Sequence, residues 1–275
     1  MTPVLPWPDA VLALKYWQWL LSGWSVTMGT SLLVIALSTL LGVLFAMARD
    51  AAAPALRTAA GVYLSVFRNT PLLVQLFFWY FGVPSLLPAG WMGWLNTPHE
   101  LALGGWHLAW PSLEFLSAAV GLVLYSTAYV GEEIRAGIQH VPRSQVQAAQ
   151  SLGMTHWQLL RFIVLPQALA RVVSPLCGQY MNITKNTSLG MTIGLVELSY
   201  RTRQAEAETF QSFQVYGIST VLYIVLIIGL ELLSRQVQRR RDLGNFRVNM
   251  FWQRGSIAMV VRYILGDIPP LDTLG

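Results

Sequence analysis

The chain has 275 residues, of which 54% are hydrophobic and only 11% charged, and its mean hydropathy is +0.49. Soluble domains carry about a quarter charged residues, so this composition argues against an ordinary soluble protein and for a membrane protein. The net charge of +5 is distributed mainly at the ends of apolar runs, which indicates membrane topology and excludes nucleic-acid binding as the reason for it.

Apolar segments predict an all-α integral membrane protein with about five transmembrane helices. Crossing a bilayer takes about 20 apolar residues, and backbone groups in hydrocarbon must pair within their own segment. The predicted spans cover about 24–48, 59–83, 113 into the sequence GEEIRAGI, 162–184 and 215–233. Residues 1–245 form one predicted membrane domain and 246–275 an unassigned tail. No cleaved signal peptide is predicted, and the single cysteine, Cys177, permits no disulfide within the chain.

Basic residues orient these spans. They follow the first span, lie between the third and fourth, and follow the fifth: Arg49, Arg57, Arg135, Arg143, Arg161, Arg235, Arg239, Arg240 and Arg241. With five spans all of these fall on one side, which the positive-inside rule makes cytoplasmic. The N-terminus is then outside and the C-terminus cytoplasmic. The segment with Arg201 and Arg203 falls outside and is an exception to the rule.

The second predicted span contains an ionisable side chain, Arg68. A charge in the middle of a membrane costs about 2.5–3.5 kcal/mol, so it either faces a polar cavity or lies near the surface beside a carboxylate such as Glu132 or Glu133. Pro71 can break the helix at this point, and such breaks serve as hinges and gates. The candidates for substrate or gate contacts in this segment are Arg68, Asn69, Thr70, Pro71 and Gln75.

Two carboxylates close the third predicted span. Glu132 and Glu133 could form a proton relay, but a structural ion pair with Arg135 is the favoured interpretation. His140 and His156 in the following loop have no partners at metal-ligand spacing, so no metal site is predicted.

A short polar helix is predicted at about 144–153, between the third and fourth spans. Pro142 suits a helix start and Gly153 a helix end. From spacing alone this helix either connects two spans or docks a partner.

The fourth span, which contains Pro166, Arg171 and Pro175, is followed by a cluster of hydrogen-bonding side chains that begins with Lys185. Such groups at a helix interruption suit a zwitterion, and a lysine without a neighbouring aspartate suits an anionic side chain. The alternative is an interfacial lysine that extends toward water. The candidates here are Lys185, Asn186, Thr187 and Ser188.

The segment 147–166 resembles the loop motif of the membrane subunits of bacterial ABC importers. That motif reads Glu-Ala-Ala, then Gly, then Ile and Leu-Pro, and the chain has Gln147-Ala148-Ala149, Gly153, Ile163 and Leu165-Pro166 at every spacing. Glutamine replaces the usual glutamate. The stretches VFRNTPLLVQLFFWYFGVP, YVGEEIRAGIQHVPRSQ and MNITKNTSLGMTIGLVEL resemble permeases for polar amino acids, above all for glutamate/aspartate and general amino acids.

The resemblance implies a type I ABC importer permease fold and a role in polar amino-acid uptake across the bacterial inner membrane. The loop would be a coupling helix that docks on an ABC ATPase homodimer, through Ser144, Gln147, Ala148, Ala149, Ser151, Leu152 and Gly153. Further implied partners are a second permease, with a heterodimer favoured over a homodimer, an extracytoplasmic amino-acid-binding protein, and membrane lipid. No cofactor is expected in this chain, because ATP and Mg would be bound by the ATPase.

Two other classes of function compete with this one. An ion-coupled secondary transporter would use Glu132, Glu133 or Lys185, but it predicts internal repeats that the sequence does not display. A membrane-embedded enzyme would need an acid/base or metal set within the spans, which is not found. The sequence has no Gly-Lys pair and therefore no P-loop, so the chain is not expected to be an enzyme or the ATPase itself.

Overall fold

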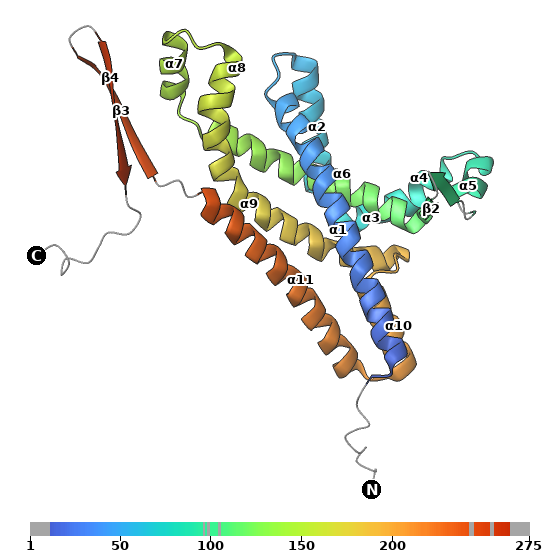
Figure 1. Cartoon of the computed structure of the whole chain (residues 1–275). Coiled ribbons are helices and arrows are strands. Elements are labelled where there is room, and N and C mark those ends of the chain that lie inside the picture. The colour runs from blue at the N-terminus through green and yellow to red at the C-terminus, as the bar shows by residue number, and fades with distance from the viewer. Residues whose placement is uncertain are drawn as a thin grey trace, which may run out of the picture.

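The computed structural model describes residues 12–95, 97, 100–103, 106–241, 245–253 and 256–264 (Figure 1). Its long helices are α1 (Leu14–Arg49), α2 (Pro54–Asn69), α6 (Leu113–Gln139), α9 (Leu165–Asn186), α10 (Leu198–Thr209) and α11 (Ser212–Arg241). The shorter helices are α3 (Leu72–Phe77), α4 (Val83–Ser85), α5 (Ala89–Leu95), α7 (Arg143–Ser151) and α8 (His156–Leu159). Strands β1 (Glu100–Leu103) and β2 (Trp106–Ala109) form one antiparallel hairpin, and β3 (Asn245–Gln253) and β4 (Ser256–Ile264) form another.

Four helical segments of the described chain are long and apolar enough to cross a membrane. They are Leu14–Arg49, Leu113–Gln139, Trp157–Ile193 and Ser212–Gln236. They correspond to the first, third, fourth and fifth predicted spans. The fourth remains helical through Pro175, and a π-helical turn (Leu160–Val164) leads into it.

The second predicted span is not one continuous helix. It is divided into α2 and the shorter apolar segment Leu72–Ser85, which includes a π-helical turn at Phe78–Gly82. Between them Thr70 and Pro71 have extended backbone. The reason is that Pro71 has no amide hydrogen and disfavours helical backbone at the residue before it. Neither part alone matches the thickness of a bilayer, so the two together take the place of the second predicted span.

Small residues allow α1 and α6 to pack closely. A Cβ atom added at Gly131 would lie 2.5 Å from the ring of Phe45 and 3.1 Å from the carbonyl oxygen of Gly42. Farther along the same face of α1, Thr27, Ser31 and other small side chains are buried. Helices in membranes associate mainly through such close contacts, because lipid offers no hydrophobic drive for their association.

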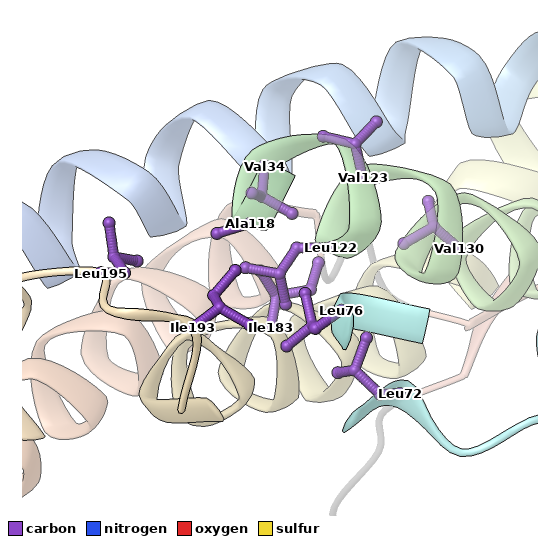
Figure 2. Packing of buried hydrophobic residues seen from close by; sticks show 10 residues of the cluster. All are labelled: Val34, Leu72, Leu76, Ala118, Leu122, Val123, Val130, Ile183, Ile193 and Leu195. Carbon is purple, nitrogen blue, oxygen red and sulfur yellow. The ribbon is translucent and has the colours of Figure 1, made fainter. Parts of the chain in front are cut away.

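The main hydrophobic cluster lies where these two helices meet α3 and α9 (Figure 2). It contains Val34 of α1, Leu122 of α6, Ile183 of α9, and both Leu72 and Leu76 of α3. The helix break that follows Arg68 and the end of α9 that follows Lys185 therefore both adjoin this cluster. This arrangement places both sets of candidate substrate or gate residues around the same part of the core.

The region that the sequence left as an unassigned tail contains most of the β3–β4 hairpin. Its strands pair from Asn245 with Ile264 to Gln253 with Ser256. It projects away from the helices (Figure 1).

Candidate functional site

Helix α7 lies at one end of the molecule beside α8, and in the chain it follows α6 (Figure 1). It spans Arg143–Ser151, close to the predicted range, and follows Pro142 as expected. Its outer face is exposed and polar, and it includes Ser144, Gln147, Ser151, Leu152 and Gly153 from the predicted docking set. A solvent-exposed helix in a short loop between two membrane spans is well placed to contact a partner.

Ala149 does not belong to that exposed face. It is 4% exposed and packs with Val141, Leu159 and Val164 under the helix. The helical period explains this, because residues 146 and 149 share the inner face while 147 and 151 lie outward. Ala148 is half-buried at the boundary. Ala149, which the motif resemblance placed among the docking residues, is thus buried within its own chain, where it anchors α7.

Gly153 ends α7 with a geometry that favours glycine. Its φ angle is +75°, in the left-handed region, and nothing lies within 4 Å of the position that a Cβ would take. The amide of Gly153 donates to the Gln150 carbonyl (2.9 Å), and the amide of Met154 donates to the Ala149 carbonyl (3.2 Å). These two bonds form a Schellman motif, which fixes the helix end and the direction of the following chain.

A charged network joins the end of α6, just before α7, to the α1–α2 connection. Arg49 donates to Glu132 (3.2 Å), and Arg135 contacts both Asp50 (2.9 Å) and Glu132 (3.6 Å). The predicted pair of Glu132 with Arg135 is thus formed. The other two residues of the network, Arg49 and Asp50, were not among the predicted site residues. Glu133 instead accepts a 3.4 Å hydrogen bond from Gln179 of α9.

Arg68 is paired with neither carboxylate in the described part of the chain. Its guanidinium carbon lies 5.2 Å from the ring centre of Tyr129, whose hydroxyl accepts a hydrogen bond from Tyr125 (3.2 Å). Cation–π contact partly compensates a charge that has lost hydration. Arg68, Asn69, Thr70 and Pro71 are all exposed at the helix break, so they remain available to a substrate or a partner.

Gln75 has a different role from the exposed residues beside it. It is buried, and its amide donates to the carbonyls of Phe67 and Thr70 (both 3.1 Å) and to the Thr70 hydroxyl (2.7 Å). The broken end of α2 leaves carbonyl groups without helical partners, and Gln75 satisfies two backbone acceptors there. Its side chain therefore holds the break together, which the sequence pattern alone could not reveal.

Lys185 is exposed in the last turn of α9 and borders a cavity of about 490 Å³. Ser188 lies beside it, whereas Thr187 is fully buried and donates to the Thr184 carbonyl (2.8 Å). The cavity combines polar groups with an aliphatic wall from α11, and its lining is Lys185, Ser188, Ser199, Thr220, Tyr223, Ile224, Ile227 and Ile228. One cation, several hydroxyls and an aliphatic wall suit a small solute with a carboxylate.

Glu197 is a buried polar residue that the sequence analysis did not identify. It begins α10, where its carboxylate accepts from the Tyr200 amide (2.9 Å) and from the hydroxyls of Thr27 (3.1 Å) and Tyr223 (2.9 Å). Burial raises the pKa of this carboxyl, against the opposing effect of its hydrogen bonds. Glu197 thus joins α1, α10 and α11 at one point.

Residues 38–242 match the family described as binding-protein-dependent transport system inner membrane component. The glutamate/aspartate import permease protein GltJ of Escherichia coli (strain K12) is 31% identical over 84% of this chain and 90% of its own length. The probable glutamine ABC transporter permease protein GlnM of Bacillus subtilis (strain 168) is 34% identical over 81% and 93%.

Solved structures agree with this match. An amino acid ABC transporter solved with histidines has a TM-score of 0.69 and 29% identity, and the alignment covers 82% of this chain and 95% of that one. The inward-facing MetNI methionine ABC transporter has a TM-score of 0.64 at 15% identity, covering 84% and 99%, and supports the fold alone.

Proposed function

Because the chain belongs to the family of binding-protein-dependent transport system inner membrane components, we propose that it is the membrane path of an ATP-driven importer for polar amino acids. It is a multi-pass subunit of the inner membrane and is not itself catalytic. A separate ATPase, a second permease and an extracytoplasmic binding protein complete the machine. The proposed substrates are glutamate and aspartate or a broader range of polar amino acids, in keeping with relatives for glutamate/aspartate (31% identical) and glutamine (34% identical).

The observation that carries this proposal is α7 itself. It is an exposed helix, fixed from below by Ala149 and closed by the left-handed Gly153, in a loop between two membrane-spanning helices. In our proposal the ATPase homodimer docks on Ser144, Gln147, Ala148, Ser151, Leu152 and Gly153. ATP and Mg are bound by that partner. Closure of the ATPase pair moves α7 and switches the path between inward- and outward-facing states.

The charged network offers a route for this movement. Arg135 and Glu132 lie in the last two turns of α6, shortly before α7 in the chain, and they contact Asp50 and Arg49 where α1 ends. A displacement of α7 is then shared by α6, α1 and the broken second span. We place this end of the molecule in the cytoplasm, with the N-terminus outside and the C-terminus cytoplasmic, and we favour a heterodimer of two unlike permeases.

Substitutions at Gly153 test the docking role. Asparagine tolerates left-handed backbone whereas alanine is strained there by about 1–2 kcal/mol, so Gly153→Asn serves as the control for backbone geometry. Gly153→Asp adds a charge to the proposed contact and should abolish ATPase recruitment and uptake while leaving membrane insertion intact. Normal uptake by Gly153→Asp would refute the docking role, because nothing in the chain itself fills that space.

A mild-detergent purification from native membranes tests the assembly. Mass spectrometry should identify an ATPase and a second permease beside this chain, and an ATPase alone would indicate a homodimer. Uptake by this chain alone in liposomes without ATP would support the ion-coupled transporter instead.

Substitutions at Lys185 test the proposed preference for acidic amino acids. If its ammonium group favours acidic solutes at the cavity that it borders, Lys185→Met should weaken glutamate and aspartate uptake more than glutamine uptake. Lys185→Arg is the matched control, because it keeps the charge. Equal loss for all three solutes would make Lys185 a gate or structural residue.

A further inference from the structure

Helix α9 has an uninterrupted polar face. Positions four and three residues apart, which share one face of a helix, carry Gln167, Arg171, Ser174, Gly178, Asn182 and Lys185. Eighteen residues at 1.5 Å each extend over about 27 Å, close to the roughly 30 Å thickness of the hydrocarbon core. We call these six residues the polar stripe, and they lie on a segment that is otherwise apolar enough to cross a membrane.

The polar stripe is not covered by its own chain. Arg171, Ser174, Asn182 and Lys185 are exposed, and a Cβ at Gly178 would have no atom within 4 Å. Within the described residues no hydrogen bond or ion pair engages the side chains of Arg171, Asn182 or Lys185. In the part of the chain that the structure describes, both cations of the stripe therefore have no hydrogen-bond or ion-pair partner.

Lipid is an unsuitable neighbour for this face. A charge in the hydrocarbon costs about 2.5–3.5 kcal/mol or more, and the stripe carries two of them. The opposite side of the helix is aliphatic. Leu165 (44%) and Leu169 (41%) are exposed near its start, whereas Val172 and Ile183 farther along the same side are buried. α9 thus separates an aliphatic side, most of which packs against its own chain, from an uncovered polar side.

We propose that the polar stripe lines the water-filled path of the transporter, and that the path attracts solutes with a carboxylate through Arg171 and Lys185. The cavity of about 490 Å³ beside Lys185 opens at the outer end of the stripe. No carboxylate is among the six residues of the stripe, and Glu133 of α6 is hydrogen-bonded to Gln179, which lies outside the stripe. This inference rests on the proposed function and adds to it the residues of the path and its charge selectivity.

Thiol labelling of the assembled complex tests the path. The only native cysteine is replaced by Cys177→Ser, and single cysteines are then introduced as Asn182→Cys, Ser174→Cys and, on the aliphatic side, Leu169→Cys. A membrane-impermeant sulfonate-bearing methanethiosulfonate is the probe. It should modify both stripe positions at least about tenfold faster than Leu169→Cys, because fields of one sign in a cleft raise anion access by that order.

The charge selectivity is tested with the same cysteines and a trimethylammonium methanethiosulfonate. The sulfonate should react faster than the cation at Asn182→Cys, and Lys185→Met should lower this ratio several-fold while Lys185→Arg preserves it. An unchanged ratio in Lys185→Met would overturn the selectivity.

Unreactive stripe cysteines in a complex that still performs ATP-driven uptake would overturn the path and place the stripe in a dry protein contact. Equal reaction at Leu169→Cys would overturn it as well. Neither result touches the importer function, which the uptake assay and the co-purified ATPase report separately.

Discussion

Replacing Glu197 by alanine should destabilise the protein more than any other single change in its polar segment 185–214. The carboxylate is fully buried, begins α10, and accepts from the hydroxyls of Thr27 and Tyr223 on two other helices. Loss of an N-cap costs about 1 kcal/mol. Loss of each buried hydroxyl hydrogen bond costs about 1 kcal/mol more, because Thr27 and Tyr223 retain contacts with Gly23 and Ser199. The expected cost is about 3 kcal/mol.

Equilibrium unfolding in mixed detergent micelles, followed by tryptophan fluorescence, measures this cost. Glu197→Gln is the matched control, since it retains the side-chain oxygen that caps the helix and fills the same volume. We expect Glu197→Gln to stay within about 1 kcal/mol of the wild type. A cost below about 1 kcal/mol for Glu197→Ala, or an equal cost for both variants, would show that the hydrogen bonds at this junction do not stabilise the fold.

Three further predictions concern the same scaffold. The pKa of Glu197 is raised in the folded protein. Its contribution to stability is therefore complete below the ordinary pKa of 4.5 and is lost as pH rises through the folded value. Glu197→Gln should flatten the dependence of the unfolding free energy on pH over that range. Arg135→Gln should lose about 1 kcal/mol and lower uptake, whereas Arg135→Lys, which keeps the charge beside Asp50 and Glu132, should retain most of both; unchanged unfolding and uptake in Arg135→Gln would show that these contacts are dispensable. Gly131→Ala should lose about 1–3 kcal/mol by forcing α6 away from α1, and unchanged unfolding would contradict the close contact.

Local features of the fold followed from the sequence. Apolar length predicted the membrane helices, because hydrocarbon forces backbone groups to pair within each segment. Pro142 and Gly153 predicted the limits of α7 to within a few residues, since both act through local backbone geometry. Pro71 indicated a possible break, but the sequence analysis treated 59–83 as one span, because its apolar residues continue on both sides of the proline.

Features that depend on distant contacts did not follow. Glu197 stands in a polar segment and becomes buried only when Thr27, 170 positions earlier, and Tyr223 are brought against it. Asp50 looked like a loop residue until α6 placed Arg135 beside it. Ala149 was assigned to the docking face from a motif, and a motif gives residue spacing but not which side of a helix packs against the core. In each case the missing information was the position of another helix.

The unequal burial of the four long segments connects the fold to the assembly. In α6, 56% of the 18-residue apolar stretch that could cross the membrane is buried within the structure. In the corresponding stretches of the segments that contain α9 and α11, the buried share is 22% and 17%. α6 and α1 are held at one end by the charged network and at the other, through α1, by Glu197, so they form the rigid part of the molecule. α9 and α11 carry the polar stripe and the cavity, and they expose most of their surface. A second permease is therefore expected to lie across the polar stripe, where two such faces would enclose water between them and keep both pairs of cations out of lipid.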